Sequence, residues 1–326
     1  MKILGINYLS ESSVALIENG KVKYAISQER LNRIKNWYGN PFKAVEFVLK
    51  ETNNKINDID IFSTHGSSAL KEKIPNMSNF LNKIDEVKFS KLQNNYKKKQ
   101  INHLKVRLSH EEKVKKRTFK KIKDLKKKYK KLEIFDHHDS HAACAYFYSG
   151  WKSCNVLTID GWGDHASSKF YEAKNGTLKN LSTSSSIDSL GYFYGSITKL
   201  LGYKPHRHEG KILGLAAYGN YKKPYKYISK MVSYDKKNKN FKGHYEKGIY
   251  IANFKNPNID FLKKKFKPQD IAAAAQKRIE EVIIDFIKDN IKKKTNLALA
   301  GGVFSNVKIN QKISEIKNIK NIFIYP

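Results

Sequence analysis

The stretch KILGINYLSESSVALIENGKVKYAIS, residues 2–27, contains three short apolar runs that are separated by polar turns. The runs Ile3–Leu9, Ser13–Ile17 and Val22–Ser27 predict three β-strands. The pair Asn19-Gly20 between the last two runs is a strong signal for a hairpin. The stretch therefore predicts a three-strand meander at the start of the chain.

The same pattern recurs in the second half of the chain. Val156–Asp160, Ser167–Glu172 and Thr177–Thr183 predict a second meander, with Asn175-Gly176 at its second turn. Helix and strand patterns alternate after each meander, which indicates a duplicated α/β unit. This is the RNase H-like plan of actin, sugar kinases and chaperone ATPases, in which a nucleotide lies in a central cleft. We expect a first domain over 1–150 and a second over 151–326.

The remaining elements follow from hydrophobic spacing and turn residues. Helices are expected from Pro41, over 137–146, over Leu190–Leu201 and Ala272–Lys292, and from Phe304; strands are expected over Ile59–Ser63, Leu132–Phe135, Leu297–Ala300 and Ile322–Tyr325. The chain stops directly after the last of these strands, where the plan has one more helix.

Residues 71–131 differ from the rest of the chain in composition. They contain 22 Lys and Arg against 6 Asp and Glu, with apolar residues scattered at helical spacing. We predict a basic helical insertion in the first domain. A solvated helical hairpin is favoured over a nucleic-acid site, because aromatic residues are too few there to stack on bases.

The whole chain is strongly basic, with 63 Lys and Arg against 30 Asp and Glu and a formal charge of +33. Such a surplus attracts polyanions. A lysine-rich coding bias is the favoured explanation of the surplus, since Asn and Ile are also abundant. The charge suits anionic small substrates such as ATP without selecting one of them.

The sequence predicts a cytoplasmic protein. Its 326 residues contain no apolar run of the roughly 18–20 residues that a membrane span needs. The start of the chain lacks the features of a signal peptide. The two cysteines, Cys144 and Cys154, do not form a disulfide framework.

Two histidines and an aspartate form a candidate metal site. His137 and His141 are four residues apart, so a helix places both imidazoles on one face. His138 points about 100° away from them, although a pair with His141 is geometrically possible. Asp160 ends an apolar strand, where carboxylates project into ligand crevices. Two imidazoles and a carboxylate suit Fe²⁺, Mn²⁺ or Zn²⁺ with positions open for substrate.

Two glycine-containing segments could approach a nucleotide. Asp160-Gly161-Trp162-Gly163-Asp164 is expected to be an acidic turn whose backbone N–H groups could face a phosphate, or an ordinary hairpin turn. Ala300-Gly301-Gly302-Val303-Phe304-Ser305-Asn306 follows a strand and opens a helix. The glycines allow close backbone approach, and a helix N-terminus favours phosphate. A tight strand-to-helix turn is the alternative.

A third segment is Glu209-Gly210-Lys211, followed by Gly214-Leu215-Ala216-Ala217-Tyr218-Gly219. It places a carboxylate and an ammonium beside flexible backbone. Lys211 could hold a phosphate as a point charge. His206, Arg207 and His208 add donors on the preceding loop. Each of these residues could equally be a solvated loop residue.

Taken together, eight segments resemble the O-carbamoyltransferase family that includes nodulation protein U and antibiotic carbamoyltransferases. They occur in the family's order and cover nearly the whole chain apart from the insertion. They are Ser12-Ser13-Val14-Ala15-Leu16, Gln28-Glu29-Arg30-Leu31, His137-His138-Asp139-Ser140-His141-Ala142, Thr158-Ile159-Asp160-Gly161-Trp162-Gly163-Asp164, Ser189-Leu190-Gly191-Tyr192-Phe193-Tyr194, Glu209-Gly210-Lys211, Gly214-Leu215-Ala216-Ala217-Tyr218-Gly219 and Gly301-Gly302-Val303.

The resemblance implies a fold similar also to the tRNA threonylcarbamoyltransferase catalytic subunit. It implies transfer of a carbamoyl group from carbamoyl-adenylate, made from carbamoyl phosphate and ATP, to a hydroxyl of a small-molecule or sugar acceptor. The family's metal ligands fall on His137, His141 and Asp160, with iron as the expected metal, which would act as a Lewis acid. Our candidate catalytic residues are His138, Glu209 and Lys211, and the candidate nucleotide-binding residues are Gly161, Gly163, Gly210, Lys211, Gly301, Gly302 and Asn306.

The chain departs from the family pattern at three places. Ser10-Glu11 stands where the family usually has His-Asp, and Asn36 follows Lys35 where a histidine is usual. Both missing histidines are candidate proton carriers. A further metal aspartate and the domain that makes carbamoyl-adenylate should follow Tyr325-Pro326. We therefore expect a fragment or a split gene that needs this missing C-terminal domain.

Two other functions remain open from the sequence. A tRNA-modifying relative is favoured by the basic charge, but Glu209-Gly210-Lys211 and the paired histidines resemble the O-carbamoyl branch more closely. An inactive nucleotide-binding module that docks through its basic insertion is favoured by Ser10 and Asn36. We expect ATP, carbamoyl phosphate and a hydroxyl acceptor as partners, and neither a membrane nor a nucleic acid.

Overall fold

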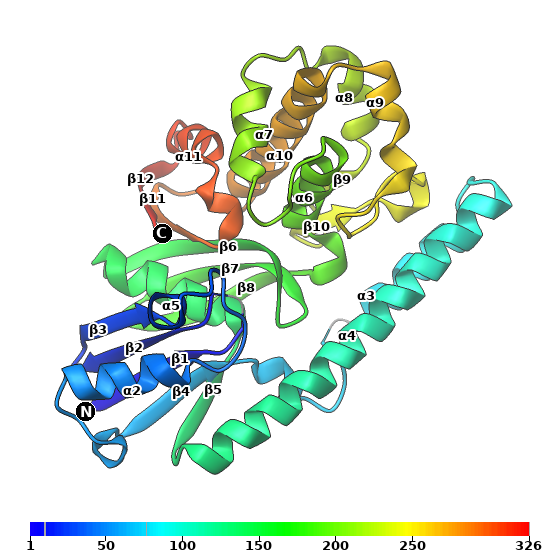
Figure 1. Cartoon of the computed structure of the whole chain (residues 1–326). Helices are drawn as coiled ribbons and strands as arrows, with labels where there is room; N and C mark the ends of the chain where they lie inside the picture. The colour runs from blue at the N-terminus through cyan, green and yellow to red at the C-terminus, as the bar shows by residue number, and fades with distance from the viewer. Residues whose placement is uncertain (10, 76, 326) are drawn as a thin grey trace. The chain divides into compact units, whose positions relative to one another are not determined.

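The computed structural model describes residues 1–9, 11–75 and 77–325, and it divides the chain into two compact units (Figure 1). The first unit comprises Met1–Glu72 and Lys113–His137, and the second comprises Lys73–Glu112 and His138–Pro326. Helix α5 (His137–Ser149) therefore lies almost wholly in the second unit. The sequence placed the domain boundary after residue 150, at the end of this helix. The two units of the structure divide at the start of the helix, between His137 and His138.

The first unit is built on a five-stranded sheet in the order β3-β2-β1-β4-β5. The strands of the first meander are β1 (Lys2–Asn7), β2 (Ser13–Glu18) and β3 (Lys21–Ser27), which pair antiparallel. β4 (Ile61–His65) and β5 (Leu132–Phe135) add to β1 in parallel. The pairing confirms the first predicted meander. The alternating apolar residues and the Asn-Gly turn fix its register locally, so a single sequence was enough to predict it.

The second unit repeats this topology in a sheet ordered β12-β11-β6-β7-β8. The meander strands are β6 (Ser153–Gly163), β7 (Ala166–Lys174) and β8 (Thr177–Ser185), again antiparallel. β11 (Thr295–Ala300) and β12 (Ile319–Ile324) join β6 in parallel. The same strand order in both sheets confirms the predicted duplicated α/β fold.

The predicted turn over Asp160-Gly161-Trp162-Gly163-Asp164 is wrong in its bounds. β6 continues through Gly163, and the turn residues are Asp164 and His165, with φ angles of 49° and 67°. The reason is a bulge, since the pairing of β6 with β7 shifts register between Ile159 and Gly163. A bulge lets one strand run further than its partner before the chain reverses.

Helices cover both faces of the second sheet. On one face, α5 packs small side chains against the strands; this cluster contains Ala142, Ala145, Tyr146, Cys154, Val156, Tyr171, Ala173, Ala298 and Ala300. On the other face lie α6 (Leu190–Leu200) and α10 (Pro268–Asn290), packed over Leu157, Ile159, Phe170, Leu297 and Leu299. Successive residues of a strand point to opposite faces, so β6 contributes alternately to the two clusters.

The predicted helical insertion forms α3 (Met77–Lys88) and α4 (Asn94–Lys128), and most of its residues are exposed or partly exposed, as expected of a solvated hairpin, but one stripe of its side chains is buried. The scattered apolar residues Phe80, Ile84, Val87 and Leu104 are buried in the core of the second unit. Lys83 is also buried, 5% exposed, and pairs with Asp188 at 3.1 Å. The remaining part of α4, from Lys113, belongs to the first unit.

Several shorter elements complete the two units. The α-helices are α1 (Glu29–Asn32), α2 (Phe42–Glu51), α7 (Glu209–Ala216), α8 (Lys222–Ile228), α9 (Phe261–Lys265) and α11 (Val307–Ser314), and a two-stranded sheet joins β9 (Val232–Asp235) to β10 (Asn240–Gly243). The 3-10 turns are η1 (Ile56–Asp58), η2 (Ser67–Leu70), η3 (Ser186–Asp188), η4 (Tyr245–Lys247), η5 (Pro257–Ile259) and η6 (Gly302–Ser305). The sequence did not predict the β9–β10 hairpin, α1, α7, α8 or α9.

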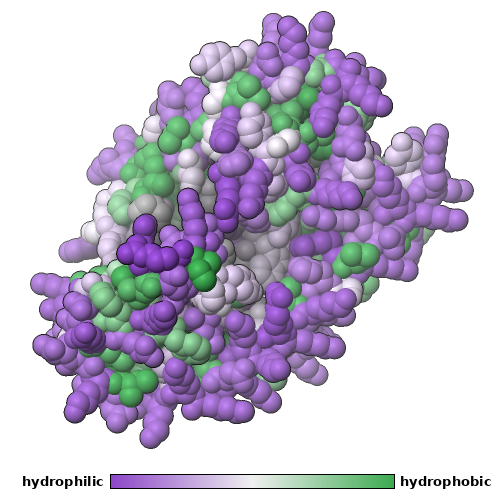
Figure 2. Space-filling view, viewed as in Figure 1, coloured by the Kyte–Doolittle hydropathy of each residue, from purple (hydrophilic) through white to green (hydrophobic). Residues whose placement is uncertain are grey.

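Hydrophilic side chains cover most of the face seen in Figure 2, and hydrophobic residues gather there only in small separate patches. This agrees with a formal charge of +33 spread along the chain. In the described parts of the chain, every helix is too short or too polar to cross a bilayer.

Candidate metal centre

The alternation of side chains along β6 places Asp160 under α5. Val156 belongs to the cluster that packs against α5, so Thr158 and Asp160 point to the same face of the sheet. His138 of α5 lies with its Nδ1 atom 2.9 Å from the Thr158 hydroxyl, and both side chains are fully buried. This contact fixes α5 at a point two residues before Asp160.

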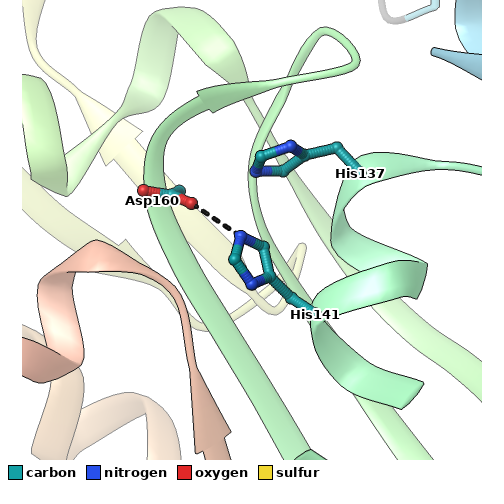
Figure 3. A group of neighbouring side chains, drawn as sticks. All are labelled: His137, His141 and Asp160. Carbon is teal, nitrogen blue, oxygen red and sulfur yellow. Dashed lines mark ion pairs between the residues drawn. The ribbon is translucent and has the colours of Figure 1, made fainter. Parts of the chain in front are cut away.

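Two other imidazoles of α5, those of His137 and His141, lie close to the carboxylate of Asp160. The candidate ligand atoms of His137, His141 and Asp160 all lie within 4.8 Å of one another. The Nε2 atom of His141 is 3.1 Å from Oδ2 of Asp160, and both rings point from the helix toward the carboxylate (Figure 3). His137 and His141 lie on one helix, which fixes their spacing. The predicted trio is thus brought together.

The other oxygen of Asp160 is held by backbone groups. Its Oδ1 atom accepts hydrogen bonds of 3.2 Å from the N–H groups of Gly161 and Gly302. Gly301 has a φ angle of 96°, and a Cβ atom there would lie 2.5 Å from the carbonyl oxygen of Ile159. Only glycine therefore fits this turn between β11 and η6. In this structure the N–H of Gly302 helps to orient the carboxylate, and Gly301 allows the backbone to turn close to Ile159.

Asp139 is a supporting residue to which the sequence assigned no role. Its Oδ1 atom accepts hydrogen bonds from the Lys169 ammonium at 3.0 Å and from the Tyr171 hydroxyl at 2.7 Å. Both donors lie on β7, so they tie the first turn of α5 to the strand beside β6. The only signal in the sequence for this role was the position of Asp139 directly after His137-His138.

The donor set fits a divalent transition metal. Two imidazoles and one carboxylate are the set found in catalytic zinc and non-haem iron sites, which keep positions open for substrate. The backbone bonds to Asp160 supply the outer support that such ligands usually have. The three residues are partly buried, so the site is within reach of small molecules.

The other predicted site residues lie in several places. Asn306 caps α11 by accepting from the Ile309 N–H at 3.2 Å, and its amide pairs with that of Gln276 at 2.9 and 3.2 Å. Gly161 and Gly163 lie within β6. His138 is fully buried beside Thr158. The catalytic role of His138 and the nucleotide contacts of the glycines stay predictions.

Glu209, Gly210 and Lys211 form the first turn of α7, where the sequence suggested a flexible segment. The Glu209 carboxylate accepts a 2.7 Å hydrogen bond from the His206 N–H, which closes the start of the helix. The Lys211 ammonium lies 5.7 Å from the centre of the Tyr203 ring. Lys211 is exposed, so its charge is available to an anion. Their catalytic roles also stay predictions.

The family model for the carbamoyltransferase N-terminus matches residues 2–326. The chain belongs to this family. An uncharacterised protein of Methanocaldococcus jannaschii is 29% identical over 97% of this carbamoyltransferase-family chain and 53% of its own length. The nodulation protein NolNO of Sinorhizobium fredii is 26% identical over 98% of the chain and 44% of its own length. The chain thus spans about half the length of these curated relatives.

The fold of this carbamoyltransferase-family chain also resembles that of HypF from T. kodakarensis. The TM-score is 0.54 at 12% sequence identity, over 99% of the chain and 44% of HypF. At this identity the likeness concerns the fold alone. It agrees with the duplicated sheet topology described above.

The sequence resemblance leads one to expect histidines where Ser10-Glu11 and Asn36 stand in this chain. Ser10 lies outside the described residues. Asn36 has a φ angle of 56°, and its N–H donates to the Glu29 carboxylate at 2.7 Å. The left-handed φ angle favours asparagine over most residues, but histidine tolerates it too, and the backbone bond is open to either, so neither feature selects asparagine over histidine. Nothing in the structure explains why asparagine replaces the usual histidine there.

Gly191 at the start of α6 sets the distance between this helix and Asp160 of β6. A Cβ atom at Gly191 would lie 2.7 Å from the Gly161 nitrogen and 2.8 Å from the Asp160 carbonyl. We predict that Gly191→Ala lowers the free energy of unfolding by about 1–3 kcal/mol through overpacking, measured by urea denaturation.

The matched control for Gly191→Ala is Gly214→Ala in α7, where nothing lies within 4 Å of the added Cβ atom. This change should raise stability by roughly 0.5–1 kcal/mol, because alanine is the better helix former. Equal effects of the two substitutions would show that α6 does not pack closely on Asp160.

Proposed function

We propose that this chain carries the catalytic site of a metal-assisted O-carbamoyl transfer. The donor would be carbamoyl-adenylate, made from carbamoyl phosphate and ATP, and the acceptor a hydroxyl of a small molecule or sugar. The observation that supports it most is the meeting of His137, His141 and Asp160 in a carbamoyltransferase-family chain. Family membership alone supports a transferase and leaves the acceptor open.

In this proposal His137, His141 and Asp160 hold the metal, with Fe²⁺ first and Zn²⁺ or Mn²⁺ as alternatives. When bound, such an ion supplies Lewis-acid polarisation of a carbamoyl or phosphate oxygen. The chain's own part is to fix the ligands. Gly161 and Gly302 orient the carboxylate, and His138 holds α5 against β6.

The nucleotide would lie against the Gly301-Gly302 turn, with the Lys211 ammonium as a counter-charge to phosphate. Gly302 is exposed and lies directly beside Asp160, which would bring a bound adenylate next to the metal. Glu209 starts α7 and keeps Lys211 in its first turn. We also propose cytoplasmic action, in line with the two free thiols of Cys144 and Cys154.

Nucleotide binding is tested by calorimetric titration with ATP and AMP. We predict that Gly302→Asp weakens ATP binding by about tenfold or more, because a carboxylate beside Asp160 repels phosphate at close range. The control is Asn175→Asp in the β7–β8 turn, which adds the same charge at a position whose left-handed φ angle of 50° an aspartate tolerates. Equal affinities of wild type and Gly302→Asp would contradict the assignment.

The transfer reaction itself is tested with radiolabelled carbamoyl phosphate, ATP and a panel of hydroxyl acceptors. A full-length carbamoyltransferase, assayed alongside with its own acceptor, shows that the assay detects transfer. Supplementing the chain with the C-terminal half of a relative tests the proposed need for an adenylate-forming domain. Wild-type protein that binds neither ATP nor AMP would overturn the proposal.

A further inference from the structure

Glu111 of α4 is a carboxylate with no exposed surface inside the second unit. Its Oε1 atom accepts hydrogen bonds from the Arg107 guanidinium at 2.8 Å, the Ser186 hydroxyl at 3.0 Å and the Trp162 indole at 3.0 Å. Its Oε2 atom accepts from the same indole at 2.9 Å and from His165 Nδ1 at 2.5 Å. Both oxygens of this carboxylate, which belongs to the basic helical insertion, thus accept hydrogen bonds from buried donors.

These donors keep Glu111 ionised. Burial alone raises the pKa of its carboxyl, but the hydrogen bond from His165 and the charge of Arg107 outweigh burial, so the pKa lies below its ordinary value. A buried charge is tolerable only when its hydrogen bonds are made. Removing the carboxylate would therefore leave several donors without an acceptor.

Two of the donors, Trp162 and His165, come from the irregular end of β6. The pairing of β6 with β7 passes from Ile159↔Ser168 directly to Gly163↔Ala166. The segment that begins with Asp160 therefore lies in the bulge, outside the regular ladder. His165 also has a left-handed φ angle of 67°, a conformation that costs energy unless its surroundings hold it.

We infer that Glu111 is a positioning residue for the metal centre: it fixes the bulged end of β6 and thereby the direction in which Asp160 presents its carboxylate. It acts through Trp162 and His165, and not by contact with the metal or a substrate. The inference rests on the proposed metal site. The basic helical insertion is not part of the duplicated fold, and this inference gives it a role in the metal site of the second unit.

The test measures Zn²⁺ affinity by competition with a colorimetric chelator, below the unfolding temperature of each variant. We expect Glu111→Ala to raise the dissociation constant about tenfold, the lower end of the range for outer partners of metal ligands. The matched control is Lys83→Met, which disrupts another buried charge of the basic helical insertion. In the wild type Lys83 pairs with Asp188 and not with Glu111. This control should leave the Zn²⁺ affinity unchanged despite its lower stability.

A second variant, Trp162→Phe, keeps an aromatic ring but removes the indole donor, and it serves if Glu111→Ala fails to fold. We expect its dissociation constant to rise at least threefold, because two contacts to Glu111 are lost. Wild-type affinity in the folded Glu111 or Trp162 variant, or equal weakening in Lys83→Met, would overturn the inference alone. A wild type that binds no Zn²⁺ would overturn the proposed site and this inference with it.

Discussion

The double substitution His137→Ala/His141→Ala is expected to reduce bound metal to background. Wild-type protein reconstituted anaerobically with Fe²⁺, or with Zn²⁺ in air, should hold about one ion per chain. Two of three candidate ligands are removed, while Asp160 keeps its backbone bonds to Gly161 and Gly302. Four-ligand zinc sites gain roughly 10–16 kcal/mol, so losing two ligands should weaken binding about 10³-fold or more.

Metal analysis after gel filtration measures this effect. The matched control is His206→Ala/His208→Ala, which removes two histidines of the loop before α7 and leaves the three candidate ligands intact. Circular dichroism should show the same fold in all three proteins, because His137 and His141 are only partly buried. Equal metal content in wild type and the His137/His141 variant would refute the site.

The second large effect is expected at a buried ion pair that joins α3 to the core of the second unit. Lys83 and Asp188 are each 5% exposed, and the ammonium lies 3.1 Å from Asp188 Oδ1 and 3.0 Å from the Gly243 carbonyl. Lys83→Met keeps the apolar stem but leaves the carboxylate buried without its cation. We predict a loss of about 3–5 kcal/mol in the free energy of unfolding at pH 7.

The free energy of unfolding of Lys83→Met should also depend on pH, in a direction set by Asp188. Burial raises the pKa of Asp188, and Lys83 partly offsets that rise. Without the lysine the folded-state pKa rises further above the unfolded value, so the folded form binds the proton more readily. Stability of the variant should therefore recover as pH falls from 7 toward 5, since protonation removes the unpaired charge.

Urea denaturation over this pH range is the measurement. The control is Lys88→Met on the same helix, whose pair with Asp85 is exposed at 2.9 Å. Exposed pairs contribute roughly 0–1 kcal/mol, so the control should change stability little at any pH. A loss below about 1 kcal/mol in Lys83→Met would mean that α3 does not rely on this pair, because breaking a buried pair normally costs several times more.

The duplicated fold could be predicted because its signals are local. Apolar alternation in β1 to β3 and the Asn19-Gly20 turn are properties of neighbouring residues, and the second meander repeats them. The meeting of the three candidate metal ligands could also be predicted from the sequence. The spacing of His137 and His141 fixes one helix face, and Asp160 ends an apolar run.

The rest depends on contacts between distant segments. Glu111 lies in a charge run that predicts a solvated helix, yet Trp162, 51 residues later in the chain, makes it a buried acceptor. The end of β6 was misplaced because its bulge is set by pairing with β7 and not by composition. The support of Asp139 likewise depends on Lys169 and Tyr171 of another strand. Single-sequence patterns carry little information about such contacts.

Residues Lys73–Glu112 of the second unit separate the two parts of the first unit along the chain. This order affects how the chain folds during its synthesis. β4 ends at His65 and its parallel partner β5 does not begin until Leu132, with α3 and α4 made between them. At about 5–20 residues per second, a ribosome needs roughly 4–14 s to add the intervening residues and β5. Throughout that interval the nascent sheet has an open β4 edge, the kind of edge that pairs with other chains.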